Sequence, residues 1–260
     1  ESVLIPHDIR EHARNTVCLS TQVGCAYGCK FCASGKTGFV RDLTAGEIVE
    51  QLVWIQREIR PDRVNNIVFM GMGEPLANYD NVMKAVRIIN SPSCAAIGSR
   101  KITISTCGLV PGIKRLPAEN IQIELSVSLH APDDRTRSLI LPVNKKFPVA
   151  ILISACREYV RKTNRQITFE YILISGVNDS TIQAEELGRL LKGLNCKLNL
   201  IPYNKIEGLD FKSPSAEAVS DFRTALFHAG VKSFIRQARG QDIAGACGQL
   251  RLRKMKLCGA

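Results

Sequence analysis

The stretch Cys25-Ala-Tyr-Gly-Cys29-Lys-Phe-Cys32 places three cysteines within eight residues of a 260-residue chain. Thiolates are soft ligands, and the spacing CxxxCxxC lets one tight loop hold three corners of a cubic iron–sulfur cluster. The next cysteine is Cys94, far beyond the loop, so we expect one iron to be left open for a substrate or cofactor. An open iron indicates chemistry rather than simple electron storage.

Zinc and disulfides are the alternatives for these cysteines. Zinc sites favour paired CxxC or Cys/His sets, and no histidine follows His12 in this region. A disulfide framework forms in an oxidising compartment, but the sequence has no apolar signal segment and no transmembrane run that would direct it there. A chain of this length can also form a stable core without disulfide bonds. We therefore favour the cluster and expect a cytoplasmic protein without membrane association.

The charge balance is basic. Lys and Arg number 35 against 24 Asp and Glu, which gives a net charge of +11, and the sequence pI is about 9.3. The excess is spread along the chain, from Arg57 to the tail Arg251-Leu-Arg253-Lys254. A spread excess suits a polyanion bound across a broad face, although a merely solvated basic surface has the same composition.

Strand and helix patterns alternate along the sequence. Thr44-Ala-Gly-Glu47 is a capping box, after which Ile48, Leu52, Ile55 and Ile59 recur on one helical face. Apolar strand patterns and helical patterns then follow each other as strand Asn66–Met70, helix Tyr79–Asn90, strands Ile102–Ser105 and Gln122–Leu129, helix Val149–Lys162, strand Gln166–Ile174, helix Thr181–Leu194, strand Lys197–Pro202, helix Ala216–His228 and strand Lys232–Arg236, with a first strand at Thr16–Ser20. About seven such units predict an α/β fold, a partial (β/α) barrel of parallel strands with outer helices, in a single domain over residues 1–260.

Four motifs directly follow predicted strands. They are Gly71-Met-Gly-Glu-Pro75, Ser105-Thr-Cys-Gly108, Ser128-Leu-His-Ala-Pro132 and Pro202-Tyr-Asn204. The cysteine loop also follows its strand. Because the carboxyl ends of parallel barrel strands lie at one face, where such folds bind and react, we expect these five segments to meet there.

The motifs together resemble a known family. CxxxCxxC after a first strand and Gly-Glu-Pro after the second are similar to the radical S-adenosylmethionine (SAM) superfamily. The strings Gln22–Cys29, Phe69–Asn78, Ser126–His130, Gly176–Ser180 and Asp242–Gln249 resemble the RlmN/Cfr family of rRNA adenine methyltransferases over essentially the whole chain. Pro75 is more typical of the RlmN branch. Family members usually carry a further N-terminal RNA-recognition domain, which we expect residues 1–260 to lack.

The resemblance implies two cofactors, a 4Fe–4S cluster and SAM. It assigns Cys25, Cys29 and Cys32 to the cluster, and Gly73 and Glu74 to the methionine amino group. The residues that it assigns to the rest of the SAM site are Ser105, Ser128, Leu129, His130 and Asn204. A carboxylate facing an ammonium is a sensible charge-assisted contact. A lone histidine after a strand is also commonly a structural residue, so His130 carries both interpretations.

Three further residues receive catalytic roles from the resemblance. Carbon 2 of adenine has no nucleophilic lone pair, so a radical route is needed. Cys247 matches the cysteine that is methylated first and then forms a covalent protein–RNA intermediate. Cys18 matches the cysteine that resolves this intermediate as a disulfide forms, and Glu1 matches the base that removes the proton from carbon 2. Without the resemblance, Cys247 and Cys18 are equally well explained as small buried residues that pack in the core. The cysteines for which we expect core packing or no role are Cys94, Cys107, Cys156, Cys196 and Cys258.

The expected substrates are adenosines in 23S rRNA and tRNA, flipped out of their stacks to reach the site. We expect a monomer that receives electrons from a donor protein such as flavodoxin or ferredoxin. Two other functions stay open. One is Cfr-type methylation of carbon 8, which confers antibiotic resistance. The other is an iron–sulfur or zinc RNA-binding module without turnover.

Overall fold

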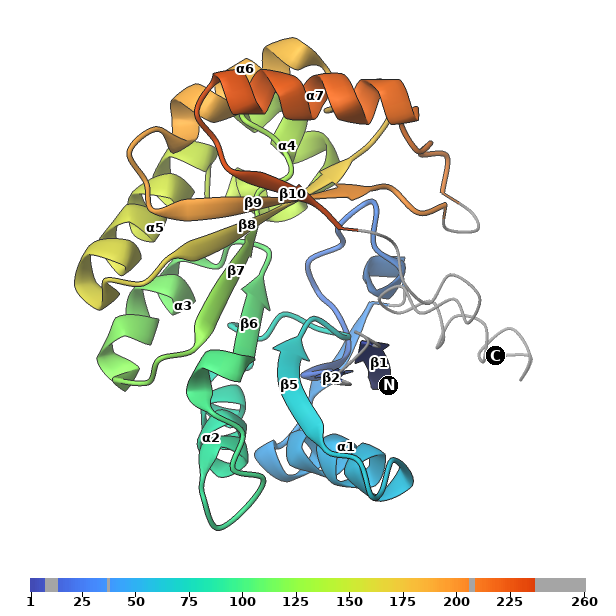
Figure 1. The fold of residues 1–260 in the computed structure, drawn as a ribbon, viewed down its shortest axis with the longest axis vertical. Coiled ribbons are helices and arrows are strands. Elements are labelled where there is room, and N and C mark those ends of the chain that lie inside the picture. The colour runs from blue at the N-terminus through green and yellow to red at the C-terminus, as the bar shows by residue number, and fades with distance from the viewer. Residues whose placement is uncertain (8–13, 37, 206–208, 237–260) are drawn as a thin grey trace.

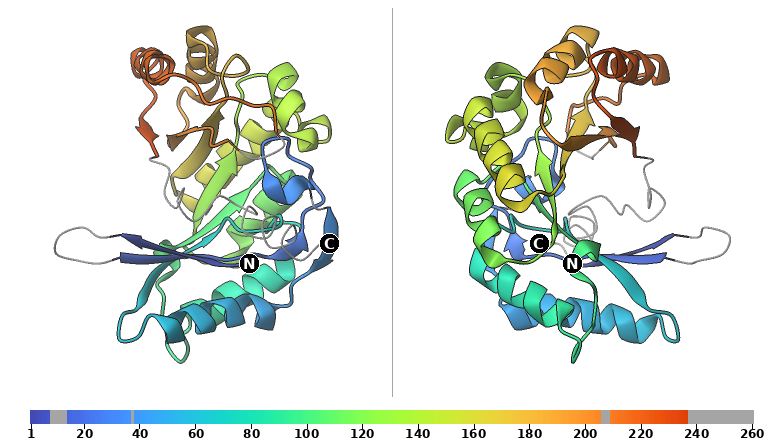
Figure 2. Two further views of the ribbon diagram at one scale, coloured as in Figure 1. Left: turned by 90° about the vertical axis from the view of Figure 1, so that its right-hand side faces the viewer. Right: turned by 60° about the vertical axis from the view of Figure 1, so that its left-hand side comes forward.

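A curled, mostly parallel sheet forms the centre of the structure, a computed structural model that describes residues 1–7, 14–36, 38–205 and 209–236 (Figure 1). Its strand order is β1-β2-β5-β6-β7-β8-β9-β10. Only β1 runs antiparallel to its neighbour, and the seven strands from β2 to β10 in this order are parallel. The views in Figure 2 show the sheet curving into a half-barrel with helices on its outer side. The expected partial barrel is confirmed.

The strands of this sheet are β1 (Val3–His7), β2 (Arg14–Cys18), β5 (Val64–Phe69), β6 (Ile102–Thr106), β7 (Glu124–Ser128), β8 (Ile167–Leu173), β9 (Cys196–Pro202) and β10 (Ser233–Ile235). Two further strands, β3 (Gln22–Gly24) and β4 (Phe39–Asp42), pair with each other in a small antiparallel sheet. The α-helices are α1 (Ala45–Glu58), α2 (Tyr79–Asn90), α3 (Val110–Arg115), α4 (Asp134–Ile140), α5 (Val149–Thr163), α6 (Thr181–Leu191) and α7 (Ala216–His228). No helix among the described residues is long and apolar enough to cross a membrane.

The two faces of the sheet differ in polarity. On β8 the alternate residues Ile167, Phe169, Tyr171 and Leu173 are fully buried in the apolar core. The ring of Tyr171 packs on Phe222 of α7 at 5.2 Å, so this set of side chains faces the outer helices. Because successive side chains of a strand point to opposite faces, the residues between them face the inside of the half-barrel.

The expected elements are confirmed with small shifts of their ends. The helix after Thr44 begins with the predicted capping box, in which Glu47 N–H donates to the Thr44 hydroxyl and Thr44 N–H to the Glu47 carboxylate. Strands β1, β3 and β4 and helices α3 and α4 were not among the predicted elements. Strand β1, which contains Pro6, lies at the edge of the sheet, where proline is tolerated.

Candidate active site

The loops after β2 and β5 are joined by backbone hydrogen bonds. Gly71 N–H donates to Leu19 O at 3.1 Å, and Thr21 N–H donates to Met72 O at 2.9 Å. Gly73 has a φ of 101°, and a Cβ there would lie 2.8 Å from the backbone nitrogen of Gln22. Only glycine fits this position, because the left-handed backbone and the close approach both exclude a side chain. The Gly71–Pro75 turn therefore lies directly against the start of the cysteine segment.

The cysteine loop is closed at its base by the β3–β4 hairpin. Cys25 N–H donates to Gly38 O at 2.9 Å, and Lys30 N–H attaches the loop to α4 through Ile140 O at 2.9 Å. Gly24 has a φ of 78°, and an added Cβ would lie 1.8 Å from the Gly38 carbonyl oxygen. The loop is thus held to the rest of the protein at both its base and its far side.

The three thiols of this loop influence one another. Burial raises the pKa of the Cys25 thiol to about 11, and Cys32 and Glu74 add to the rise. Burial also raises the pKa of the Cys29 thiol, with further contributions from Cys32, Cys25 and Glu74. Bound iron would offset the repulsion among these groups, because a metal cation stabilises a coordinating thiolate. The donor set therefore fits a cluster with three cysteine ligands.

The disulfide alternative finds no support, since Cys18 and the seven other cysteines in the described part of the chain are all free. Among the described residues, no three His, Cys, Asp or Glu side chains lie close enough together to hold one metal ion, and this includes Cys25, Cys29 and Cys32. The partner expected for Cys18, Cys247, lies outside the described residues, as does Cys258.

Glu74 is almost completely buried and connects two strand-end loops. Its carboxylate accepts hydrogen bonds from Cys107 N–H at 2.7 Å and Leu76 N–H at 3.0 Å, and its own N–H donates to Gln22 Oε1 at 2.8 Å. Burial raises the pKa of this carboxyl, while those amides lower it. The side chains of Cys107 and Thr106 hydrogen-bond to the same carboxylate, and its contact with the methionine ammonium stays a prediction.

His130 lies inside the protein, with 3% of its surface exposed. Its Nδ1 accepts from Ile172 N–H at 3.0 Å, and its ring meets Phe31 of the cysteine loop edge-on at 4.8 Å. Burial, reinforced by Arg137, lowers the pKa of this imidazole to about 3, so the ring is neutral. The structure gives His130 a packing role against the cysteine loop, and its contact with SAM stays a prediction.

Arg137, which sequence reasoning missed, holds the same loops. It is fully buried, and its guanidinium donates to the carbonyl oxygens of Cys107 at 2.8 Å, Ser128 at 3.0 Å and Leu129 at 3.0 Å. It also donates to Asn144 Oδ1 at 2.9 Å. Its only signal in the sequence is an arginine in a short, otherwise ordinary amphipathic segment, so pattern reasoning could not find it.

Cys18 and Glu1 lie near each other at the first strands. The β1–β2 register pairs Val3 with Cys18, and the Ser20 hydroxyl donates to the backbone carbonyl of Glu1. Burial raises the pKa of the Cys18 thiol to about 11. The charge of Glu1 adds to this rise, whereas Arg236 lowers it. The two residues with expected roles at the target base are therefore neighbours, beside the strand that leads into the cysteine loop.

The remaining expected SAM residues follow the inner face and the carboxyl end of the sheet. Ser105 on β6 is in register with Ser126 of β7, and Ser128 ends that strand. Leu129 is fully buried, and Asn204 follows β9 half-buried. Hydrogen bonds of Glu74 and Arg137 join the segments that follow β5, β6 and β7, and the contacts of Ser105, Ser128, Leu129 and Asn204 with SAM stay predictions. Sequence reasoning also missed Glu170, a buried carboxylate in register beside Ser128.

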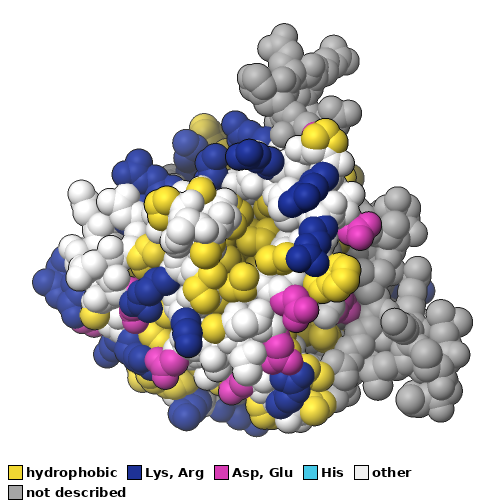
Figure 3. Space-filling model, turned by 90° about the horizontal axis from the view of Figure 1, so that it is seen from below, with side chains coloured by type: hydrophobic (Ala, Val, Ile, Leu, Met, Phe, Trp, Pro, Cys, Tyr) yellow, Lys and Arg dark blue, Asp and Glu magenta, His cyan; other side chains and the backbone are white. Residues whose placement is uncertain are grey.

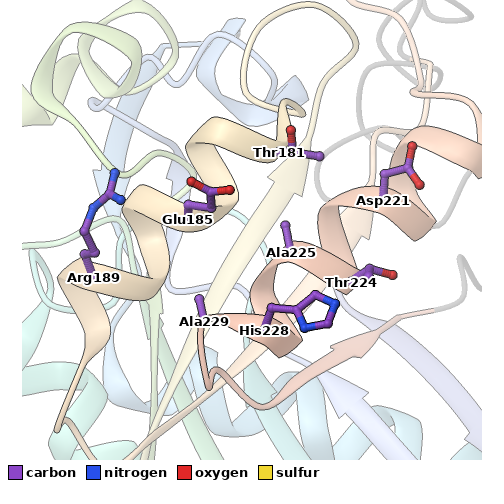
Figure 4. A pocket seen from close by; sticks show the side chains of 8 residues that line it. All are labelled: Thr181, Glu185, Arg189, Asp221, Thr224, Ala225, His228 and Ala229. Carbon is purple, nitrogen blue, oxygen red and sulfur yellow. The ribbon is translucent and has the colours of Figure 1, made fainter.

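A separate hollow lies outside the sheet, between α6 and α7 (Figure 4). Side chains of both charges line it, among them Glu185, Arg189 and Asp221. None of the sequence-predicted site residues belongs to it.

The half-barrel with a three-cysteine loop after its first parallel strand defines a radical SAM enzyme, and residues 19–186 match the model of the radical SAM superfamily. A crystal structure of a radical SAM methyltransferase from Sphaerobacter thermophilus superposes with a TM-score of 0.91 at 50% identity, covering 95% of this chain and 72% of that one. A dual-specificity RNA methyltransferase RlmN from Syntrophobacter fumaroxidans is 48% identical over 251 residues, 96% of this chain and 72% of the relative. A relative from Akkermansia muciniphila, named a probable dual-specificity RNA methyltransferase RlmN, is 52% identical over 258 residues, 98% of this chain and 72% of its own length.

The chain therefore belongs to the radical SAM superfamily and, within it, to the RlmN family of RNA methyltransferases. A 4Fe–4S cluster and SAM are the cofactors of this superfamily and of this enzyme.

Proposed function

We propose that this enzyme methylates carbon 2 of adenosine in RNA, with adenosines of 23S rRNA and of tRNA as substrates. The observation that carries the proposal is the meeting of three elements at one end of the sheet. These are the three-thiol loop, the Gly71–Pro75 turn against it, and Cys18 at the end of the neighbouring strand. The RlmN names of relatives that are about half identical over most of this chain support RNA as the substrate.

Cys25, Cys29 and Cys32 would hold the cluster, which when bound supplies the electron for reductive cleavage of SAM. Glu74 would bind the methionine ammonium in a charge-assisted contact. Gly73 keeps this turn open, because any side chain there would collide with Gln22.

The bond to the base would be made by protein residues. Cys247 would carry the methyl group as a thioether and form the covalent link to carbon 2. The Glu1 carboxylate would accept the proton that leaves carbon 2, and Cys18 would release the methylated base from the protein. The proximity of Glu1 and Cys18 supports these paired roles, since both must reach the same base.

The proposal includes a setting for the reaction. We assign the enzyme to the cytoplasm, where ribosomal and transfer RNA are made, as a monomer that receives electrons from flavodoxin or ferredoxin. The net charge of +11 supports binding to a polyanion.

An anaerobic assay tests the proposal. Reconstituted protein, a reductant, SAM and an RNA substrate should give 2-methyladenosine, detected by mass spectrometry of the RNA nucleosides. Finding 8-methyladenosine instead would overturn the choice of carbon. If no 5′-deoxyadenosine forms from SAM at all, the protein is an RNA-binding module without turnover.

The cysteine roles have their own test. Cys18→Ala should accumulate a covalent protein–RNA adduct, visible as a shifted band on a denaturing gel, because release is blocked after the link has formed. Cys247→Ala should show no adduct. Buried Cys156 in α5 offers a matched control, and Cys156→Ala should behave like the unaltered protein. A Cys18→Ala protein without adduct would contradict the role assigned to that residue.

A further inference from the structure

The far side of the cysteine loop reaches the protein surface beside α4. Lys30 stands between Cys29 and Cys32 in the sequence, and its side chain is exposed. Its backbone N–H donates to the carbonyl oxygen of Ile140, the last residue of α4, at 2.9 Å. The surface at this contact therefore begins next to two of the three expected cluster ligands.

The exposed side of α4 carries an apolar residue among cations. Leu139 is 64% exposed, and Arg135, one helical turn before it on the same face, is exposed as well. Two more exposed cations, Lys145 and Lys146, directly follow Asn144, which is hydrogen-bonded to α4 at 2.9 Å. The name α4 surface is used below for the set Lys30, Arg135, Leu139, Lys145 and Lys146.

The positive charge of the α4 surface is not neutralised by the part of the protein that the structure describes. None of its four cations forms an ion pair with another described residue. The two aspartates at the start of α4 accept hydrogen bonds from the backbone, Asp133 from Thr136 N–H at 2.8 Å and Asp134 from Val149 N–H at 2.7 Å. An uncompensated basic surface attracts an acidic partner.

The place of the α4 surface in the fold favours a redox protein over RNA as that partner. Glu1 and Cys18, which have proposed roles at the target base, belong to the β1–β2 edge, whereas α4 follows β7, three strands further along the sheet. A partner on α4 would leave that edge open for RNA and would lie close to the cysteine loop. Complexes for electron transfer are small, weak and steered by charge, which suits one exposed leucine flanked by cations.

We propose that the α4 surface is the docking site of an acidic one-electron donor protein. One electron passes from the reduced cofactor of the donor to the cluster held by the cysteine loop, and no bond forms or breaks. This inference rests on the proposed function, which names flavodoxin or ferredoxin as the donor. It adds the surface at which that donor binds.

Two variants of the α4 surface and one matched control test the proposal. Arg135→Glu and Leu139→Glu change exposed side chains, and glutamate is favourable in the first turn of a helix, where Arg135 lies. The control is Arg161→Glu, the same charge reversal at an exposed position in the last turn of α5. Because α5 leads back to the start of β8, Arg161 lies toward the opposite end of the sheet from the cysteine loop.

The measurement is anaerobic reduction of reconstituted protein by purified, reduced flavodoxin, followed as bleaching of the visible absorbance of the cluster. At low salt, the second-order rate constant should fall roughly fivefold to twentyfold in Arg135→Glu and Leu139→Glu, because interface charges mainly change the association rate. The Kd for fluorescently labelled flavodoxin, measured by anisotropy, should rise by a similar factor. Arg161→Glu should stay within about twofold of the unaltered protein. Dithionite, a small reductant that needs no docking surface, should reduce all four proteins equally.

Several outcomes would overturn the inference. Equal rates with flavodoxin in all four proteins would show that the α4 surface does not bind the donor. Equal slowing in Arg161→Glu would attribute the effect to net charge, and slower reduction by dithionite would mean that the substitutions disturb the cluster itself. Unchanged reduction by flavodoxin with weaker binding of an RNA oligonucleotide would assign the α4 surface to RNA.

Failure of this inference and failure of the proposed function can be distinguished. If dithionite reduces the unaltered protein and neither flavodoxin nor ferredoxin does, the docking site is wrong, while methylation is still measured with dithionite as the reductant. If flavodoxin reduction slows only in the α4 variants and no methylated adenosine forms, the docking site stands and the proposed methylation fails.

Discussion

At the scale of single residues, buried polar side chains organise this site more than exposed ones do. Arg137 is fully buried, and its guanidinium is hydrogen-bonded to carbonyl oxygens of Cys107, Ser128 and Leu129. Burial lowers its pKa to about 10, which still leaves it charged at neutral pH. A planar group with five donors suits such a task, and an ammonium does not.

Arg137→Lys should therefore lower the free energy of unfolding by roughly 2–4 kcal/mol, because several buried carbonyl groups lose their donor. Urea denaturation followed by circular dichroism measures the change. Arg135→Lys, at an exposed position of the same helix, is the control and should stay within about 0.5 kcal/mol. Equal stability of the two variants would contradict the role given to Arg137.

Because His130 is buried, we expect the stability of the protein to depend on pH. Its pKa in the folded protein is about 3, below the ordinary value of 6.5, because burial disfavours the charged ring. The unfolded chain thus binds a proton between these values that the folded protein does not. The contribution of His130 to the free energy of unfolding is therefore fully present above pH 6.5 and is lost as the pH drops toward 3.

Between pH 6.5 and 5.5 this group should remove about 1 kcal/mol from the free energy of unfolding. Denaturation of unaltered protein and His130→Asn at both pH values isolates the effect, and asparagine tolerates the left-handed backbone at this residue, φ 58°. The variant should show a flatter pH dependence. The same slope in both proteins would mean that His130 is not the group responsible.

At the scale of elements, the small β3–β4 hairpin determines the shape of the cysteine loop. Gly24 and Gly28 both have a positive φ, but only Gly24 has backbone where a Cβ would lie, at 1.8 Å from Gly38 O. Around an added Cβ at Gly28, no heavy atom lies within 4 Å. The two glycines therefore form a matched pair.

Gly24→Ala should sharply reduce the iron bound per chain after anaerobic reconstitution, because the hairpin must open to accept the methyl group. Gly28→Ala should retain most of its iron, since it meets only the left-handed backbone cost of roughly 1–2 kcal/mol. Iron analysis and the visible absorbance of the cluster measure the difference. Full iron content in Gly24→Ala would contradict the importance of the hairpin closure.

At the scale of the whole molecule, charge rather than shape indicates the partner. Figure 3 shows Lys and Arg side chains distributed around a central hydrophobic area on the face seen from below, with fewer acidic side chains among them. Together with the net charge of +11, this distribution suits contacts to many phosphates across a broad surface.

The affinity for an RNA oligonucleotide should fall steeply with salt, since each phosphate contact releases counterions. With roughly four to seven contacts to single-stranded RNA, a plot of log K against log salt should have a slope of about −3 to −5. Fluorescence anisotropy between 50 and 300 mM KCl measures it, and an uncharged oligonucleotide analogue is the control. An affinity independent of salt would rule out the basic surface as the binding face.

The sequence by itself determined the parallel half-barrel, the cysteine loop and the strand-end motifs, because apolar strand runs, a capping box and ligand spacing are local patterns. Thr44 caps its helix through Glu47, three residues further on. The tertiary structure decided the rest. Arg137, Glu170 and the contact of His130 with Phe31 depend on segments far apart in the chain. The role of a buried polar group depends on the partners that folding brings into contact with it. No local sequence pattern identifies those partners.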